Sequence, residues 1–210
     1  MFEKIIDPAD PNVPALIGQF GFSEFESAEV VDFGPTGRCY WNCDDYVAKH
    51  GGKVIHGWQI IGWPLVWVSL FHHAVVRKPN GQLIDVTKPE WEHTGATAFV
   101  PDQSITPPRD YPIMVENRYL SFGGTCEAAQ MTVDTHVEQC RILRRLAQIA
   151  KEQGVTVTPL EPLRLLQTPE VKKLAGEFAV TRHKVDKARQ LCRAEEARRA
   201  QSLRARGQLD

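Results

Sequence analysis

The feature that most constrains this chain is a short turn between two segments rich in β-branched and aromatic residues. The turn has the sequence Lys-Pro-Asn-Gly-Gln at 78–82. Proline suits the first central position of a type I turn, asparagine the second, and glycine the left-handed residue that follows. The flanking segments 64–78 and 82–87 have the composition of strands. We therefore predict a hairpin in which Lys78 pairs with Gln82.

The register of this hairpin decides which histidine shares a face with Asp85. If paired residue numbers sum to 160, as 78 and 82 do, Asp85 lies opposite Val75 and diagonally beside His73. A two-residue Asn-Gly loop would give sums of 161 and place His72 on the face of Asp85, further from its diagonal reach. We therefore predict that Asp85 orients His73.

A helix is predicted to begin at Cys39 and to end near His50. The pair Gly51-Gly52 would terminate it, since glycine tolerates positive φ. Unpaired N–H groups and the helix dipole stabilise a thiolate at a helix start. We therefore predict that Cys39 is a nucleophile, that His73 removes its proton and later protonates the leaving group, and that Asp85 orients the His73 ring. The helix face that should pack on the strands carries Cys39, Asn42, Cys43, Tyr46, Val47 and His50.

Three further residues are candidates for weaker roles at this site. The side chain of Asn42 or Gln59 could supply an oxyanion donor beside the backbone N–H of Cys39. Trp58 is a candidate for substrate contact. Cys43 is expected to be a buried structural cysteine, because it lies one turn further along the same helix face. Surface or packing roles are expected for His50, His56 and His72.

Four short segments between residues 36 and 87 follow one another in an order that matters: T-G-R-C-Y-W-N-C, G-G-K-V-I-H-G-W, H-A-V-V and G-Q-L-I-D-V-T. Together they resemble the transglutaminase-like branch of the papain-like cysteine enzymes. In that superfamily Gly-x-Cys opens a helix, a His starts a later strand, and the Asp of L-x-D-x-T completes a triad. The resemblance implies an α+β core in which the Cys helix packs on an antiparallel sheet. It also implies a thiol hydrolase or acyltransferase that acts on amide or peptide bonds through a thioester, without a cofactor.

The rest of the chain is predicted to surround this core. Residues 1–24 form a lead segment, within a stretch of loops and short elements that extends to residue 37, and residues 25–125 form the papain-like domain. Prolines make 94–112 irregular, and a further strand falls within 111–122. The helical C-terminal region, 126–210, holds two helices, at about 134–153 and 168–206. The second begins with Thr168-Pro169-Glu170, a capping pattern.

Charge is unevenly distributed along the chain. The net charge is −1, yet the segment from Arg182 to Arg206 holds nine Lys/Arg and three acids. Such a basic helix can bind nucleic acid, an acidic protein surface or the acidic remainder of the chain itself. One alternative to an enzyme is therefore an interaction protein that uses this helix on an inert core.

A zinc site is a second alternative. Its ligands would be Cys39, Cys43, His72 and His73. Adjacent histidines on a strand point to opposite faces, so the two rings cannot easily reach one ion. We therefore predict no metal.

The N-terminal residues and the cysteines indicate the cellular compartment in which the protein is expected. Residues Met1 to Asp10 place acids and a lysine around only two adjacent isoleucines, unlike a signal peptide, and no apolar run approaches the roughly 18 residues of a membrane span. The chain has five cysteines, an odd number at irregular spacing, unlike the disulfide framework of a small secreted domain. We expect a cytoplasmic protein.

Overall fold

The computed structural model describes residues 3–107, 115–124, 126–155 and 168–208. Contacts divide the chain into two units. We call Glu3–Gly62 with Ser69–Arg109 the strand unit, and Trp63–Val68 with the chain from Asp110 onward the helix unit. The units are not continuous in sequence. Whether the segments 1–24, 25–125 and 126–210 are separate domains stays a prediction.

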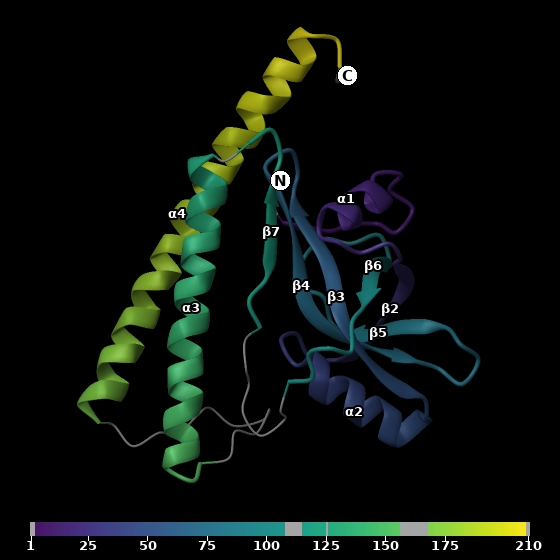
Figure 1. Cartoon of the computed structure of the whole chain (residues 1–210), viewed down its shortest axis with the longest axis vertical. Helices are drawn as coiled ribbons and strands as arrows, with labels where there is room; N and C mark the ends of the chain where they lie inside the picture. Colours follow the sequence, from purple (N-terminus) through teal and green to yellow (C-terminus); the bar gives the residue numbers. More distant parts are fainter. Residues whose placement is uncertain (1–2, 108–114, 125, 156–167, 209–210) are drawn as a thin grey trace. The chain divides into compact units, whose positions relative to one another are not determined.

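The strands of the α+β fold pair into a mixed sheet (Figure 1). Among the described residues the strand order is β1-β3-β6-β2-β5-β4-β7, and a further pairing of β3 with β4 closes five strands into a ring. One side chain from each of the five ring strands packs into a single apolar cluster of Ala28, Ile55, Val75, Leu83 and Phe99. The elements up to residue 101 are β1 (Lys4–Ile5), α1 (Val13–Gln19), β2 (Glu26–Gly34), α2 (Cys39–His50), β3 (Lys53–Trp63), β4 (Trp67–Arg77), β5 (Leu83–Thr87) and β6 (Ala96–Pro101).

The expectation of a purely antiparallel sheet was wrong. β2 pairs parallel with β5 and antiparallel with β6. Both β2 and β6 lie in segments that we predicted to be loops or irregular chain. In β2 the exposed acids Glu29 and Asp32 interrupt the apolar alternation, and β6 is a six-residue strand between Gly95 and a proline-rich stretch. Burial between neighbouring strands, which local sequence does not reveal, stabilises both.

The predicted hairpin register is confirmed. Strand β4 pairs with β5 through Val76 with Ile84 and Arg77 with Leu83, so paired numbers sum to 160. The backbone N–H of Lys78 donates to the carbonyl of Gln82 at 2.9 Å. Glycine is required in this turn, because Gly81 has a φ of 89°. His73 and Asp85 therefore share one face of the hairpin.

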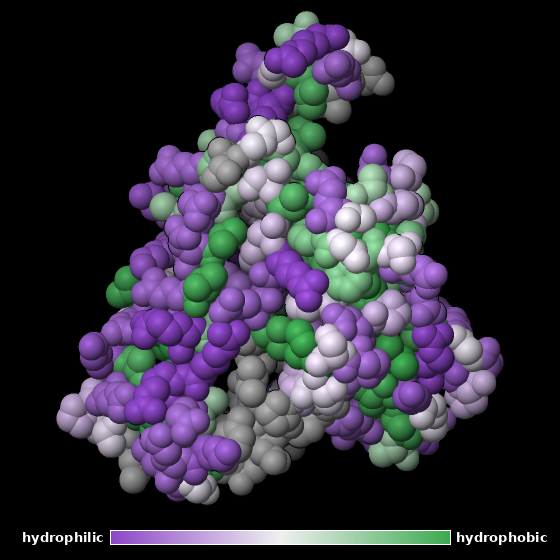
Figure 2. Space-filling model, in the orientation of Figure 1, coloured by the Kyte–Doolittle hydropathy of each residue, from purple (hydrophilic) through white to green (hydrophobic). Residues whose placement is uncertain are grey.

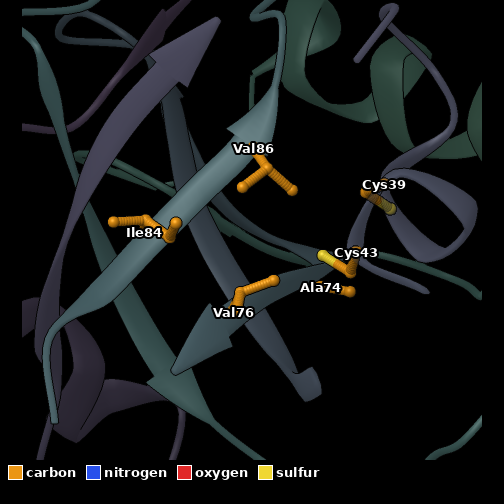
Figure 3. Packing of buried hydrophobic residues seen from close by; sticks show 6 residues of the cluster. All are labelled: Cys39, Cys43, Ala74, Val76, Ile84 and Val86. Carbon is orange, nitrogen blue, oxygen red and sulfur yellow. The ribbon is translucent and has the colours of Figure 1, made fainter. Parts of the chain in front are cut away.

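The helix predicted from Cys39 to about His50 is also confirmed. Helix α2 spans Cys39–His50 and ends at Gly51, which has a φ of 74°. Cys43 is fully buried, as expected of a structural cysteine. Figure 3 shows Cys43 of α2 facing apolar side chains of β4 and β5, with Cys39 further along at the start of the helix. This cluster consists of Cys39, Cys43, Ala74, Val76, Ile84 and Val86.

The helix unit contains β7 (Arg118–Ser121), α3 (Glu127–Glu152) and α4 (Pro169–Ala205). Helices α3 and α4 run side by side (Figure 1) around the cluster Ile142, Ile149, Ala150, Val171 and Leu174. The predicted cap of α4 is confirmed, since the Thr168 hydroxyl accepts from the N–H of Val171 at 3.2 Å. Helix α3 begins seven residues before the predicted start, because Ala128 and Ala129 are buried in its first turn. No helix among the described residues combines the length and hydropathy needed to cross a membrane.

The end of the β3–β4 hairpin is anchored to α4 within the helix unit. The indole N–H of Trp63 donates to Glu196 at 3.0 Å. Leu65 adopts a left-handed φ of 63°, which is unfavourable for a leucine. The guanidinium of Arg199 donates to the carbonyls of Leu65 and Phe122. This turn is therefore held by an arginine of the C-terminal helix.

Part of the basic charge of α4 is paired within the helix unit. Lys184 forms an ion pair with Glu138, and Arg198 and Arg199 both contact Glu195. Figure 2 shows hydrophilic side chains along the C-terminal part of this helix. The chain's own acids therefore account for some of the charge asymmetry. A nucleic acid or acidic protein partner at Arg182 to Arg206 stays a prediction.

Replacing Gly34 with alanine should destabilise the fold at the start of α2. An added Cβ would lie 2.3 Å from side-chain atoms of Asn42, a distance that forces one of them to move. Overpacking of this kind costs roughly 1–3 kcal/mol. Urea unfolding measures it, and Gly18→Ala, where the Cβ meets open space in α1, is the matched control. A Gly34→Ala protein as stable as the control would contradict this packing.

Candidate cysteine site

Helix α2 begins at Cys39, and contacts from outside the helix position its first turn. Arg38, at the N-cap position, makes no side-chain capping hydrogen bond. Instead, the side-chain amide of Asn42 donates to the carbonyl of Pro35 at 2.9 Å and to the hydroxyl of Thr87 at 3.0 Å. These bonds tie the first turn of α2 to the end of β5. Gly34 leaves the space that Asn42 occupies.

These contacts give Asn42 a different role from the predicted one. An amide nitrogen has two N–H donors, and Asn42 directs its nitrogen to Pro35 and Thr87. Neither N–H remains for an oxyanion near Cys39. Asn42 therefore holds the helix in place.

His73 and Asp85 form a buried ionisable pair. Nε2 of His73 lies 2.9 Å from Oδ2 of Asp85, and the two residues are 5% and 1% exposed. The carboxylate also accepts from the Thr87 backbone N–H at 3.1 Å and from the Gln59 amide at 3.3 Å. Gln59, predicted as a possible oxyanion donor, thus contacts the carboxylate. The pair fixes both the position of the ring and the nitrogen that meets the acid.

The second ring nitrogen of His73 remains for the thiol. Nδ1 is buried and makes no hydrogen bond to any residue that the structure describes. Burial is the largest influence on the pKa of His73 and lowers it. The charges of Asp85 and Cys39, with the hydrogen bond to Asp85, outweigh burial and raise that pKa well above 6.5. The contact of the ring with Asp85 is the one that the register predicted, and the Cys39 thiol is near enough to raise the pKa of the ring as well.

A second cysteine–histidine pair in the helix unit provides an internal comparison. Sγ of Cys140 lies 3.4 Å from Nε2 of His136, one helical turn away on α3. Burial is the main influence on both residues: it raises the pKa of Cys140 to about 11 and lowers that of His136. Both groups are therefore neutral near pH 7. Sequence reasoning missed this pair, although its i, i+4 spacing signals a shared helix face.

His72 belongs to a different cluster, on the opposite face of β4. Its Nδ1 lies 2.7 Å from the hydroxyl of Tyr40, and its ring meets that of Trp58 edge-on at 5.0 Å. The indole N–H of Trp58 donates to Asp102 at 2.9 Å. Trp58 is 1% exposed, which leaves little surface for the substrate contact that we predicted. The packing role expected of His72 is confirmed.

The structure does not gather the four alternative zinc ligands. His73 contacts Asp85, whereas His72 contacts Tyr40. Within the ranges that the structure describes, no three or more His, Cys, Asp or Glu side chains are arranged to hold a metal ion. The opposite directions of neighbouring strand residues separate the two rings.

Comparisons with known proteins return nothing: no family model, no curated protein and no solved structure matches this chain. The function must therefore be argued from the geometry of the site.

The pKa values of the two neighbouring histidines, His72 and His73, should be shifted in opposite directions. His73 should lose its proton well above pH 6.5, whereas burial, with the charges of His56 and His73, lowers the pKa of His72 to about 4. The charge on His73 therefore stabilises the fold fully below pH 6.5 and less as pH rises through its folded pKa. His72 costs stability as pH falls from 6.5 toward 4.

Histidine ring NMR shifts measured against pH test this pattern. In Asp85→Asn the His73 titration should move to lower pH, while the His72 titration stays where it is. Coinciding titrations of the two rings in the wild-type protein would contradict the proposed surroundings of His73.

Proposed function

We propose that this protein is a cysteine hydrolase or acyltransferase with a papain-like, transglutaminase-like core that acts on an amide or peptide bond. One observation carries the proposal: a buried imidazole is paired with a buried carboxylate, and the thiol that begins a helix is near enough to raise the pKa of that imidazole. The raised pKa of His73 favours an imidazolium beside Cys39 near neutral pH. A nearby imidazolium and a helix start both favour a thiolate.

In the first half of the reaction the Cys39 thiolate attacks the carbonyl carbon of the substrate amide. Cys39 is the first residue of α2, so its N–H is among those that the helix leaves unpaired, and it can donate to the oxyanion. The C–N bond then breaks. The His73 imidazolium gives its proton to the departing amine, leaving a thioester on Cys39 and a neutral ring.

In the second half water or an amine attacks the thioester. The neutral His73 takes a proton from the incoming group, the C–S bond breaks, and the thiolate and imidazolium are restored. Asp85 holds Nε2 and so fixes the orientation of the ring, which leaves Nδ1 for the proton transfers. Water yields hydrolysis and an amine yields acyl transfer.

The internal comparison supports this proposal over a structural cysteine. Cys140 and His136 are also buried together, but burial dominates both and leaves the pair neutral. His73 is at least as buried, yet the charges on its two sides reverse the direction of its pKa shift. Burying a charge is costly unless it is paired and hydrogen-bonded. The Asp85 carboxylate meets this condition through its three hydrogen bonds, one of which is to the His73 ring.

Cys39 should react with iodoacetamide faster than the other four cysteines near pH 7. Cys126 is the demanding comparison, because it is the most exposed cysteine and lies at the start of α3. If access alone governed alkylation, Cys126 would react first. Mass mapping of partially alkylated protein gives the individual rates.

His73→Ala is the control for this experiment. It should slow alkylation of Cys39 by at least about tenfold while leaving Cys126 unchanged, because only Cys39 loses its imidazolium. Equal rates for Cys39 in both proteins would remove the support for an activated thiolate.

Asp85→Asn should slow labelling of Cys39 by an electrophilic peptide-amide mimic by roughly tenfold or more, since the ring loses its orienting charge. Asp45→Asn, an exposed acid on the same helix as Cys39, is the matched control and should have no effect. Circular dichroism and thermal unfolding report on the fold. A large loss of stability with an unchanged labelling rate would show that Asp85 is structural.

A further inference from the structure

Two successive residues of α2 meet two successive residues of β4. Cys39 is near enough to His73 to raise the pKa of its ring, and the next residue, Tyr40, places its hydroxyl 2.7 Å from Nδ1 of His72. The two histidines point to opposite faces of the strand. The start of the helix is therefore linked to the strand that carries the base by a contact separate from the reactive pair.

His72 is a rigid anchor for this link. It is 4% exposed and stacks on His56, with ring centroids 6.3 Å apart and an interplanar angle of 13°. Trp58 meets its ring edge-on at 5.0 Å, and Asp102 in turn fixes the indole of Trp58. These two ring contacts restrict the movement of the His72 side chain.

The protonation state of His72 suits it to accept a hydrogen bond. Burial first, then the charges of His56 and His73, lower its pKa to about 4. The ring is therefore neutral at pH 7, and its Nδ1 can accept the hydroxyl hydrogen of Tyr40.

We infer that Tyr40 is a positioning residue: its hydrogen bond to His72 holds the first turn of α2 against β4 so that the Cys39 sulfur reaches His73. Helix α2 has no side-chain N-cap, so contacts from other elements set the place of its start. Asn42 provides the link to β5, and Tyr40 provides the link to β4. This inference rests on the proposed function of Cys39.

Tyr40→Phe tests the inference, because it removes only the hydroxyl of a partly exposed side chain. The rate of Cys39 alkylation is measured against pH in the full chain. Loss of one hydrogen bond should slow the reaction at pH 7 by about three- to tenfold, and the midpoint of the pH profile should move toward that of His73→Ala. Tyr46→Phe, the same change one to two turns further along α2, is the matched control and should alter the rate less than about twofold.

His72→Phe provides a second route to the same conclusion. If both side chains act through one bond, the double variant should react no more slowly than the slower single variant. Additive losses, or a Tyr40→Phe profile that matches wild type, overturn the inference while leaving the proposed function intact. A wild-type Cys39 profile identical to that of His73→Ala overturns both.

Discussion

The register between β4 and β5 is the constraint on which the site depends. Because the turn leaves Gly81 in a left-handed conformation, Val76 pairs with Ile84 and the odd-numbered residues of both strands share a face. That face holds His73 and Asp85 at hydrogen-bond distance. The even-numbered face packs against α2 through Ala74, Val76, Ile84 and Val86, beside the buried Cys43 (Figure 3). One short loop thus separates the polar pair from the apolar packing of the helix.

Electrostatics distinguishes this site from ordinary buried histidines in the same chain. His72 and His136 are buried with weak or opposing charges around them, and burial lowers the pKa of both. His73 is buried beside Asp85 and Cys39, and its pKa rises. Burial in a low dielectric penalises an isolated charge but strengthens the attraction between opposite ones. The neighbours of the ring therefore decide its protonation state.

Local sequence predicts the elements whose signals are complete within a few residues. The Pro-Asn-Gly turn, the Gly51 helix stop and the Thr168 cap each follow from backbone chemistry at one position, and all three are present. The positions of Cys39, His73 and Asp85 followed from the same signals. Strands β2 and β6 were not predicted, because their stability comes from neighbouring strands that are distant in sequence. The amides of Asn42 and Gln59 were recognised as polar and near the site, but their partners depend on side-chain packing.

The arginine-held turn at the end of the β3–β4 hairpin has a consequence for shortening the protein. Strands β3 and β4 are continuous from Gln59 and His73 to the tryptophan and leucine that α4 holds. Truncation before α4 would remove the acceptor of the buried Trp63 indole and the guanidinium that holds the left-handed Leu65. A shortened chain that keeps Cys39, His73 and Asp85 would therefore lose support at the turn between the two strands that carry Gln59 and His73.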